Sequence, residues 1–227
     1  MYALEICCYS DTSVRLAAIN GADRAELCGP GAGGTTPDEA TIRTCRSIPG
    51  IKLHILIRPR TGDFCYSETE FEQMKDSVLF ARQLRADGVV FGILNPDGTV
   101  DINRNRTLAA LAAPMDTTFH KAFDECKDLF QALNAISDCG IHRILTSGGA
   151  ADAQTGASIL RSLIHHAADR IAILPGGGLH SGNVAEVARA TGAGELHTGL
   201  GEEIPYSSLD IAAFESAVRD CLAKLLK

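Results

Sequence analysis

The chain has 227 residues, of which 45% are hydrophobic and 22% charged, and this composition is typical of a globular protein with a sizeable core. Its formal net charge of −7 and its lack of tryptophan argue against a nucleic-acid-binding surface. No apolar run is long enough to span a bilayer, and residues 1–8 have no basic segment before their apolar residues, so we expect a cytoplasmic protein.

Short apolar runs alternate with helical patterns along the whole chain. The runs typical of strands cover residues 4–8, 24–28, 53–57, 88–94, 117–120, 143–147, 171–174 and 195–198. Helical patterns cover residues 11–20, 102–112, 129–139, 159–166 and 181–190, the last of these starting at Ser181. The final helix is expected to bury one apolar face made of Ile211, Phe214, Val218, Leu222 and Leu225.

Two further helices carry capping signals. Thr36, Pro37 and Glu39 form one predicted capping box, with proline at the first helical position. Ser67 and Glu70 form the other.

Eight strand–helix repeats with short connections predict parallel strands joined by right-handed crossovers. We therefore expect an α/β fold, a single (β/α)₈ TIM barrel over residues 1–227. The alternative is an open doubly wound sheet, but its GxGxxG fingerprint is missing after the first strand.

Strand residues alternate between the helix-facing side and the barrel interior. The side chains expected to face the helices are Leu4, Ile6, Cys8, Ala25, Leu27, Leu53, Ile55, Ile57, Phe119 and Leu196. Those expected inside include Glu5, Cys7, Arg24, Glu26, Cys28, His54, Arg58, His120, Glu195 and His197. Because lone buried charges are not tolerated, such an interior must be a hydrogen-bonded network, at a site or in the scaffold.

The loop IRPRTGDFCYS, residues 57–67, follows the third strand and places Arg58 and Arg60 on either side of Pro59. Their forked guanidinium groups suit a phosphate or a carboxylate, although structural salt bridges would explain them too. Gly177, within the glycine run 176–178, could bring backbone amides close to an anion, or form only a tight turn. We assign Glu5, Arg58, Arg60, Ser147, Gly177 and His197 to substrate binding, while Glu202 and Glu203 would repel phosphate if they pointed inward.

General acid–base catalysis is a second possibility for this end of the barrel. Glu26 is the candidate base, His120 the acid or electrophile, and Asp124 the group that orients its neighbours. Lys121 could in principle form a Schiff base, but alternation points it away from the His120 side unless the strand has ended before it.

Soft-metal binding is a third possibility. Cys7 and Cys28 are expected to be close neighbours on adjacent strands, and thiolate together with imidazole suits Cu(I) or Zn. The chain has eight cysteines and no CxxC pair, so in the cytosol we expect free thiols; the alternative is that these two are small core residues.

Several segments, spread over almost the whole chain, together resemble the CutC family of copper homeostasis proteins. They are EICCYS (5–10), GADRAELC (21–28), GGTTPD (33–38), IRPRTGDFCYS (57–67), FHKAFD (119–124), RILTSG (143–148) and ELHTG (195–199). The resemblance implies a TIM barrel and a cytosolic protein linked to copper binding. Lys121 stands where the family is expected to have arginine, which speaks against a Schiff base.

Two functions remain open from the sequence. The first is copper binding in copper homeostasis, and the second is an enzyme acting on a small anionic metabolite, which could be phosphorylated. We further expect a homodimer, a single pocket shared by Glu5, Glu26, Arg58, His120 and His197, and an ion pair of Arg58 with Glu5 or Glu26.

Overall fold

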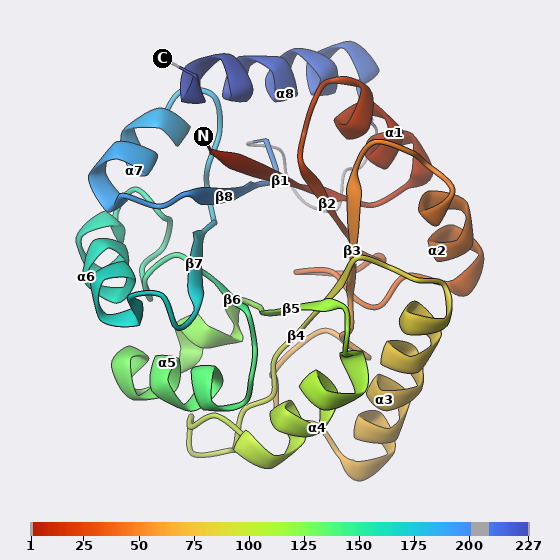
Figure 1. Cartoon of the computed structure of the whole chain (residues 1–227), viewed down its shortest axis with the longest axis vertical. Helices are drawn as coiled ribbons and strands as arrows, with labels where there is room; N and C mark the ends of the chain where they lie inside the picture. Colours follow the sequence, from red (N-terminus) through yellow and green to blue (C-terminus); the bar gives the residue numbers. More distant parts are fainter. Residues whose placement is uncertain (1, 201–208, 227) are drawn as a thin grey trace.

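The computed structural model describes residues 2–200 and 209–226, and it places eight parallel strands inside a ring of helices (Figure 1). The expected TIM barrel is confirmed. The strands are β1 (Ala3–Cys8), β2 (Arg24–Leu27), β3 (Lys52–Leu56), β4 (Gly88–Phe91), β5 (Asp116–Phe119), β6 (Arg143–Thr146), β7 (Ala172–Pro175) and β8 (Glu195–Thr198).

Helices follow the strands in alternation, and a short 3₁₀ helix precedes the fifth of them. They are α1 (Asp11–Ile19), α2 (Glu39–Arg46), α3 (Glu68–Gln83), α4 (Ile102–Ala112), the 3₁₀ helix η1 (Lys121–Glu125), α5 (Leu129–Asp138), α6 (Ala157–Ala167), α7 (Val184–Thr191) and α8 (Ile211–Leu225). Among the described residues, none of the helices combines the length and the apolar character needed to cross a lipid bilayer.

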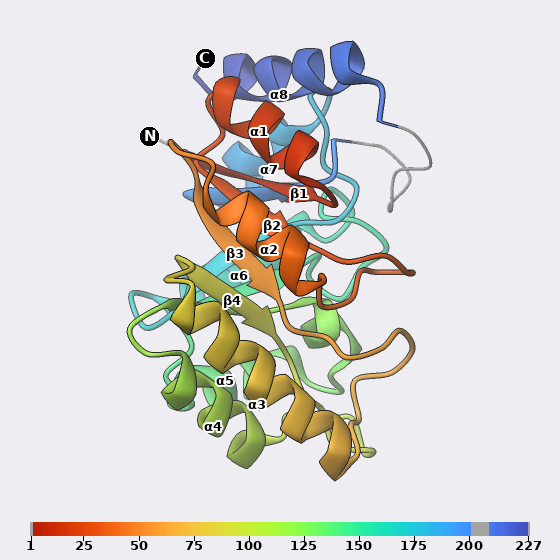
Figure 2. The same ribbon diagram turned by 90° about the vertical axis from the view of Figure 1, so that its right-hand side faces the viewer.

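The sheet runs in the order β7-β6-β5-β4-β3-β2-β1-β8. The first strand, β1, pairs with the last, β8, and this register places Glu5 beside His197. The described strands β7 and β8 share no hydrogen-bonded ladder, which leaves the barrel nearly closed. Figure 2 shows the loops after β2 and β3 projecting from the same end of the barrel, where the carboxyl ends of the strands meet.

The hydrophobic core follows the expected alternation of strand side chains. A large cluster between strands and helices contains Leu4, Ile6, Cys8, Ala25, Leu27, Leu53, Ile55, Ile57, Phe119 and Leu196. A small separate cluster inside the barrel contains only Cys7, Cys28, Leu56 and Val90, with Tyr9 packed against it. The barrel interior is therefore mostly polar, as predicted.

The helix starts agree with the sequence in part. The Ser67–Glu70 capping box before α3 is confirmed. The box at Thr36 is wrong: α2 begins at Glu39, with Asp38 as the cap residue that accepts from the Thr41 amide at 2.9 Å. The Thr36 hydroxyl instead accepts the backbone N–H of Arg58, at 2.8 Å.

Two other helix predictions need correction. Helix α7 begins at Val184 instead of Ser181, because the Asn183 side chain accepts from the His180 amide and closes a turn just before it. In α8, Phe214, Val218 and Leu225 are buried as expected and Leu222 is partly buried, but Ile211 is 52% exposed because it starts the helix at the edge of the core.

Candidate functional site

A cavity of about 410 Å³ opens at the carboxyl end of the strands. Strands β1, β2 and β8 contribute Cys7, Glu26 and His197, and the segments after β2, β3 and β5 contribute Cys28, Arg58, His120 and Asp124. Four of the five residues expected to share one pocket line this cavity. The exception is Glu5, which is fully buried beneath His197 and does not reach the cavity surface.

Two thiols meet on one side of the cavity. The Sγ atoms of Cys7 and Cys28 are 3.8 Å apart and are not joined in a disulfide, so the expected proximity is confirmed. Three atoms that could coordinate a metal ion, one each from Cys7, Glu26 and His197, all lie within 4.8 Å of one another. Contact with Cys28 and His197 lowers the pKa of Cys7 to about 5, so this thiol is readily ionised.

A hydrogen bond to Glu5 fixes the orientation of the His197 ring. Its Nδ1 atom is 2.7 Å from Oε1 of Glu5, which leaves Nε2 on the side of Glu26, 3.7 Å from Oε2 of that residue. Burial alone would lower the pKa of His197, but contacts with Cys7 and Glu5 raise it well above its usual value. Burial also raises the pKa of Glu26 to about 8, so that its carboxyl group keeps a proton at neutral pH.

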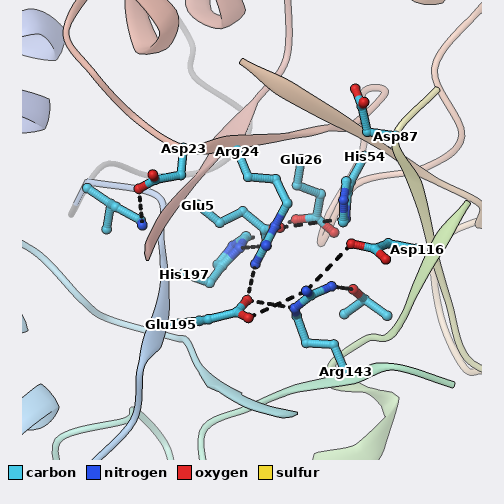
Figure 3. Close-up of polar contacts among 12 residues, drawn as sticks. Glu5, Asp23, Arg24, Glu26, His54, Asp87, Asp116, Arg143, Glu195 and His197 are labelled. Carbon is cyan, nitrogen blue, oxygen red and sulfur yellow. Dashed lines mark hydrogen bonds and ion pairs between the residues drawn. The ribbon is translucent and has the colours of Figure 1, made fainter. Parts of the chain in front are cut away.

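Glu5 connects the cavity-lining His197 to a polar network in the interior of the barrel (Figure 3). It forms an ion pair with buried Arg24, which also donates to Glu195 at 2.7 Å. Glu195 in turn accepts from Nε of Arg143 at 2.7 Å. Burial would raise the pKa of Glu5, but Arg24 and His197 outweigh it and hold that pKa well below its usual range. The predicted interior network is thus present.

His54 lies next to this polar network but takes no part in its hydrogen bonds. The ring is fully buried, its Nδ1 is 3.9 Å from Glu5, and neither ring nitrogen has a hydrogen-bond partner among the described residues. Gly88 makes room for it, since a Cβ atom at that position would lie 2.6 Å from the ring. Burial lowers the pKa of His54 to about 4, so the ring is neutral at physiological pH.

Arg58 does not form the expected ion pair with Glu5 or Glu26. Its guanidinium donates to three backbone carbonyls, those of Ala32 and Gly34 at 3.0 Å each and of Gly62 at 2.7 Å. The group also lies over the ring of Phe64, with 4.8 Å from Cζ to the ring centroid. The partners of Arg58 are therefore backbone carbonyls of the loops after β2 and β3 and not a carboxylate, so its side chain links these two loops.

Arg60 lies away from the cavity, although the sequence grouped it with Arg58. Its guanidinium pairs with Glu70 at 2.6 Å and with Asp63 at 2.9 Å, on the outer side of the loop. These are the structural salt bridges that the sequence left open as an alternative.

Asp124 anchors the loop after β6. It accepts from the backbone amides of Ser147 and Gly149, at 3.1 and 2.8 Å, and from Lys121 Nζ at 2.6 Å. Ser147 and Gly177 lie beside this group but do not line the cavity. Asp124 is therefore placed to orient Lys121 and this loop, while Glu202 and Glu203 lie outside the described residues.

Lys121 lines the cavity, contrary to the expectation from alternation. Strand β5 ends at Phe119, and the chain turns into η1 with His120 as its cap. The strand has thus ended before Lys121, alternation no longer applies there, and the side chain lines the cavity. Arg143, which joins the polar network inside the barrel through Glu195, was also missed.

Fold and site define a TIM-barrel protein whose cavity, at the carboxyl ends of the strands, combines a pair of thiols with imidazole and carboxyl groups. A family model described as the CutC family matches residues 2–202. The chain belongs to the CutC family.

Individual relatives agree with this assignment. A family protein CutC from Chromobacterium violaceum is 47% identical over 195 residues, covering 86% of this chain and 79% of the relative. One from Porphyromonas gingivalis is 43% identical over 205 residues, covering 90% and 83%.

Solved structures support the fold. One from Streptococcus agalactiae, described as the copper homeostasis protein CutC, superposes with a TM-score of 0.84 at 28% identity, covering 89% of this chain and 100% of that one. Phosphoribosylanthranilate isomerase from Thermotoga maritima, at 16% identity and a TM-score of 0.63, covers 100% of this chain and 99% of its own, and shares the fold alone.

Proposed function

We propose that this protein binds Cu(I) as part of copper homeostasis, with Cys7 and Cys28 as ligands and His197 as a third donor. The observation that carries the proposal is the pair of thiols 3.8 Å apart in the cavity. Thiolate and imidazole are the donors that Cu(I) prefers. The Streptococcus agalactiae relative, described as a copper homeostasis protein, supports the same function.

The surroundings of Cys7 suit a soft cation, whereas contact with Cys7 and burial raise the pKa of Cys28 well above its usual value. Metal binding needs a deprotonated thiol, and the lowered pKa of Cys7 makes that deprotonation easy. Glu5 fixes the Nδ1 side of His197, as carboxylates do for metal-bound histidines in general. Because the pKa of His197 is raised, the metal must displace a proton from Nε2 when it binds. Copper here would be the cargo of the protein, bound by the buried side chains of Cys7, Cys28 and His197.

The Cu(I) site is tested by anaerobic titration of the reduced protein against a chromogenic Cu(I) chelator. We expect one Cu(I) per chain, with the affinity about 100-fold lower or worse in Cys7→Ser and in Cys28→Ser, since each removes a ligand. Cys65→Ser is the matched control, because Cys65 is only half-buried and lies outside the cavity. Unchanged affinity in both cavity variants would contradict the proposal.

We also propose that the chain, as one domain over residues 1–227, acts in the cytoplasm as a homodimer. The symmetric habit of soluble proteins supports a dimer. Light scattering should give twice the chain mass of 24.0 kDa, and cell fractionation should place the protein in the cytosol. A monomer mass across the working concentration range would remove the dimer.

A further inference from the structure

We propose that the same cavity also binds a small organic anion, held by Arg58, His120 and Lys121. This set of residues shares no member with the proposed copper ligands, so the inference goes beyond the copper site. A small carboxylate and a phosphate ester carry the chemistry that these three donors would recognise.

His120 offers a hydrogen-bond donor that nothing in the described chain accepts. Its Nδ1 accepts the Ala122 amide at 3.3 Å, so in the neutral ring the proton is on Nε2. Nε2 is buried in the wall of the cavity and has no partner among the described residues. Burial, together with the charge of Arg58, lowers the pKa of His120 to about 3 and keeps the ring neutral. A buried donor without an acceptor is costly, and a ligand oxygen would satisfy it.

Arg58 supplies a buried positive charge that no carboxylate balances. Its side chain is buried, its polar contacts are carbonyl groups, and no salt bridge among the described residues includes it. Its Nε–H also has no hydrogen-bond acceptor there. Phe64 contacts both groups: its ring centroid is 4.8 Å from Cζ of Arg58 and 4.8 Å from the centroid of the His120 ring. An anion would balance this charge.

Lys121 adds a third donor nearer the solvent. Asp124 and Ser147 hold its ammonium group at 2.6 and 2.9 Å, and its side chain remains 45% exposed. The acidic side chains that line the cavity are Glu26, Asp124 and Glu125. Asp124 is already satisfied by Lys121 and backbone amides, Glu125 is exposed, and Glu26 lies on the thiol side, so none of them pairs with Arg58.

The size and the apolar part of the cavity suggest what else the anion carries. A volume of about 410 Å³ is in the range of sites for small molecules, and far larger than a single ion needs. Ala32, Leu56 and Leu145 line it together with Phe64. These surfaces fit a short carbon skeleton attached to the oxyanion.

The experiment is calorimetry on the reduced, metal-free, full-length protein with four probes: succinate, pyruvate, glycerol 3-phosphate and inorganic phosphate. We expect saturable binding of at least one organic probe, and about 10-fold weaker binding in His120→Phe, which keeps a ring but loses the donor. Tighter binding of the phosphate ester than of the carboxylates would identify a phosphorylated ligand, and the reverse order a carboxylate. No saturable heat from any probe up to about 10 mM would overturn the proposal.

Two arginine variants sharpen the test. Arg58→Lys keeps the charge but loses the fork, so the affinity should fall about 10-fold, whereas Arg60→Lys, outside the cavity, should bind as the wild type does. Arg58 also links two loops, so Arg58→Lys could fail to fold. In that case His120→Phe alone tests the anion site. Equal anion affinities in His120→Phe and wild type would overturn the proposal. Cys28→Ser should keep anion binding, so failure of the copper site and failure of the anion site can be told apart.

Discussion

Replacing Glu5 with leucine is expected to lower the free energy of unfolding by about 3–5 kcal/mol, because it leaves a buried charge without its partner. Arg24 is buried and pairs with Glu5 and Glu195, and His197 contacts Glu5 through Nδ1. Loss of the carboxylate leaves Arg24 with only Glu195, which is half-buried. It also frees the ring of His197, so Cu(I) affinity should fall about 10-fold even where the protein stays folded.

The matched control removes both members of the pair. In Glu5→Leu/Arg24→Met the buried charge is gone from both sides, and much of the lost stability should return. Urea unfolding at pH 7, followed by circular dichroism, measures all three proteins. A loss below about 1 kcal/mol in Glu5→Leu would show that this ion pair contributes little.

Acidification should destabilise the protein through His54. The unfolded chain takes up a proton on this histidine near pH 6.5, whereas burial holds the folded pKa at about 4. Between these values the unfolded state binds more protons, so stability is present above pH 6.5 and is lost as the pH falls towards 4. At about 1.4 kcal/mol per pH unit, His54 alone accounts for a loss of about 3 kcal/mol over this window.

Unfolding curves at several values between pH 4.5 and 7 isolate this effect when wild type is compared with His54→Phe, which keeps a planar ring over Gly88. The slope of unfolding free energy against pH should be smaller in the variant by about 1.4 kcal/mol per unit. Other groups with shifted pKa values, such as Glu26, are present in both proteins and cancel. His165→Gln, on the exposed face of α6, should keep the wild-type slope. Parallel curves for His54→Phe and wild type would show that His54 is not the acid-sensitive group.

Much of the interior could be predicted from the sequence, because period-two alternation is a property of the strand itself. The inward positions of Glu5, Cys7 and Cys28 and the outward positions of the helix-facing residues followed from that rule. The proximity of Glu5 and His197 required only that the first and last strands pair.

Loops and strand ends limited the prediction of the site. The partners of Arg58 are carbonyls at residues 32, 34 and 62, and no side-chain pattern reveals where backbone carbonyls of two loops will meet. The side on which Lys121 lies depends on whether the strand continues past Phe119, and the local sequence does not show that β5 ends there.

The nearly closed sheet has a consequence for how the barrel opens. Among the described strands, β8 has a backbone ladder with β1 but not with β7. On the side away from β1, only side-chain hydrogen bonds of the described residues hold it, from Arg143 to Glu195 and from the Thr198 hydroxyl to the Leu179 carbonyl. Local opening of a protein begins where the fewest such bonds must break. A fluctuation that detaches β8 would carry His197 away from Cys7 while the other ladders stay intact. The cluster of Cys7, Glu26 and His197 can therefore separate and re-form without unfolding of the rest of the barrel.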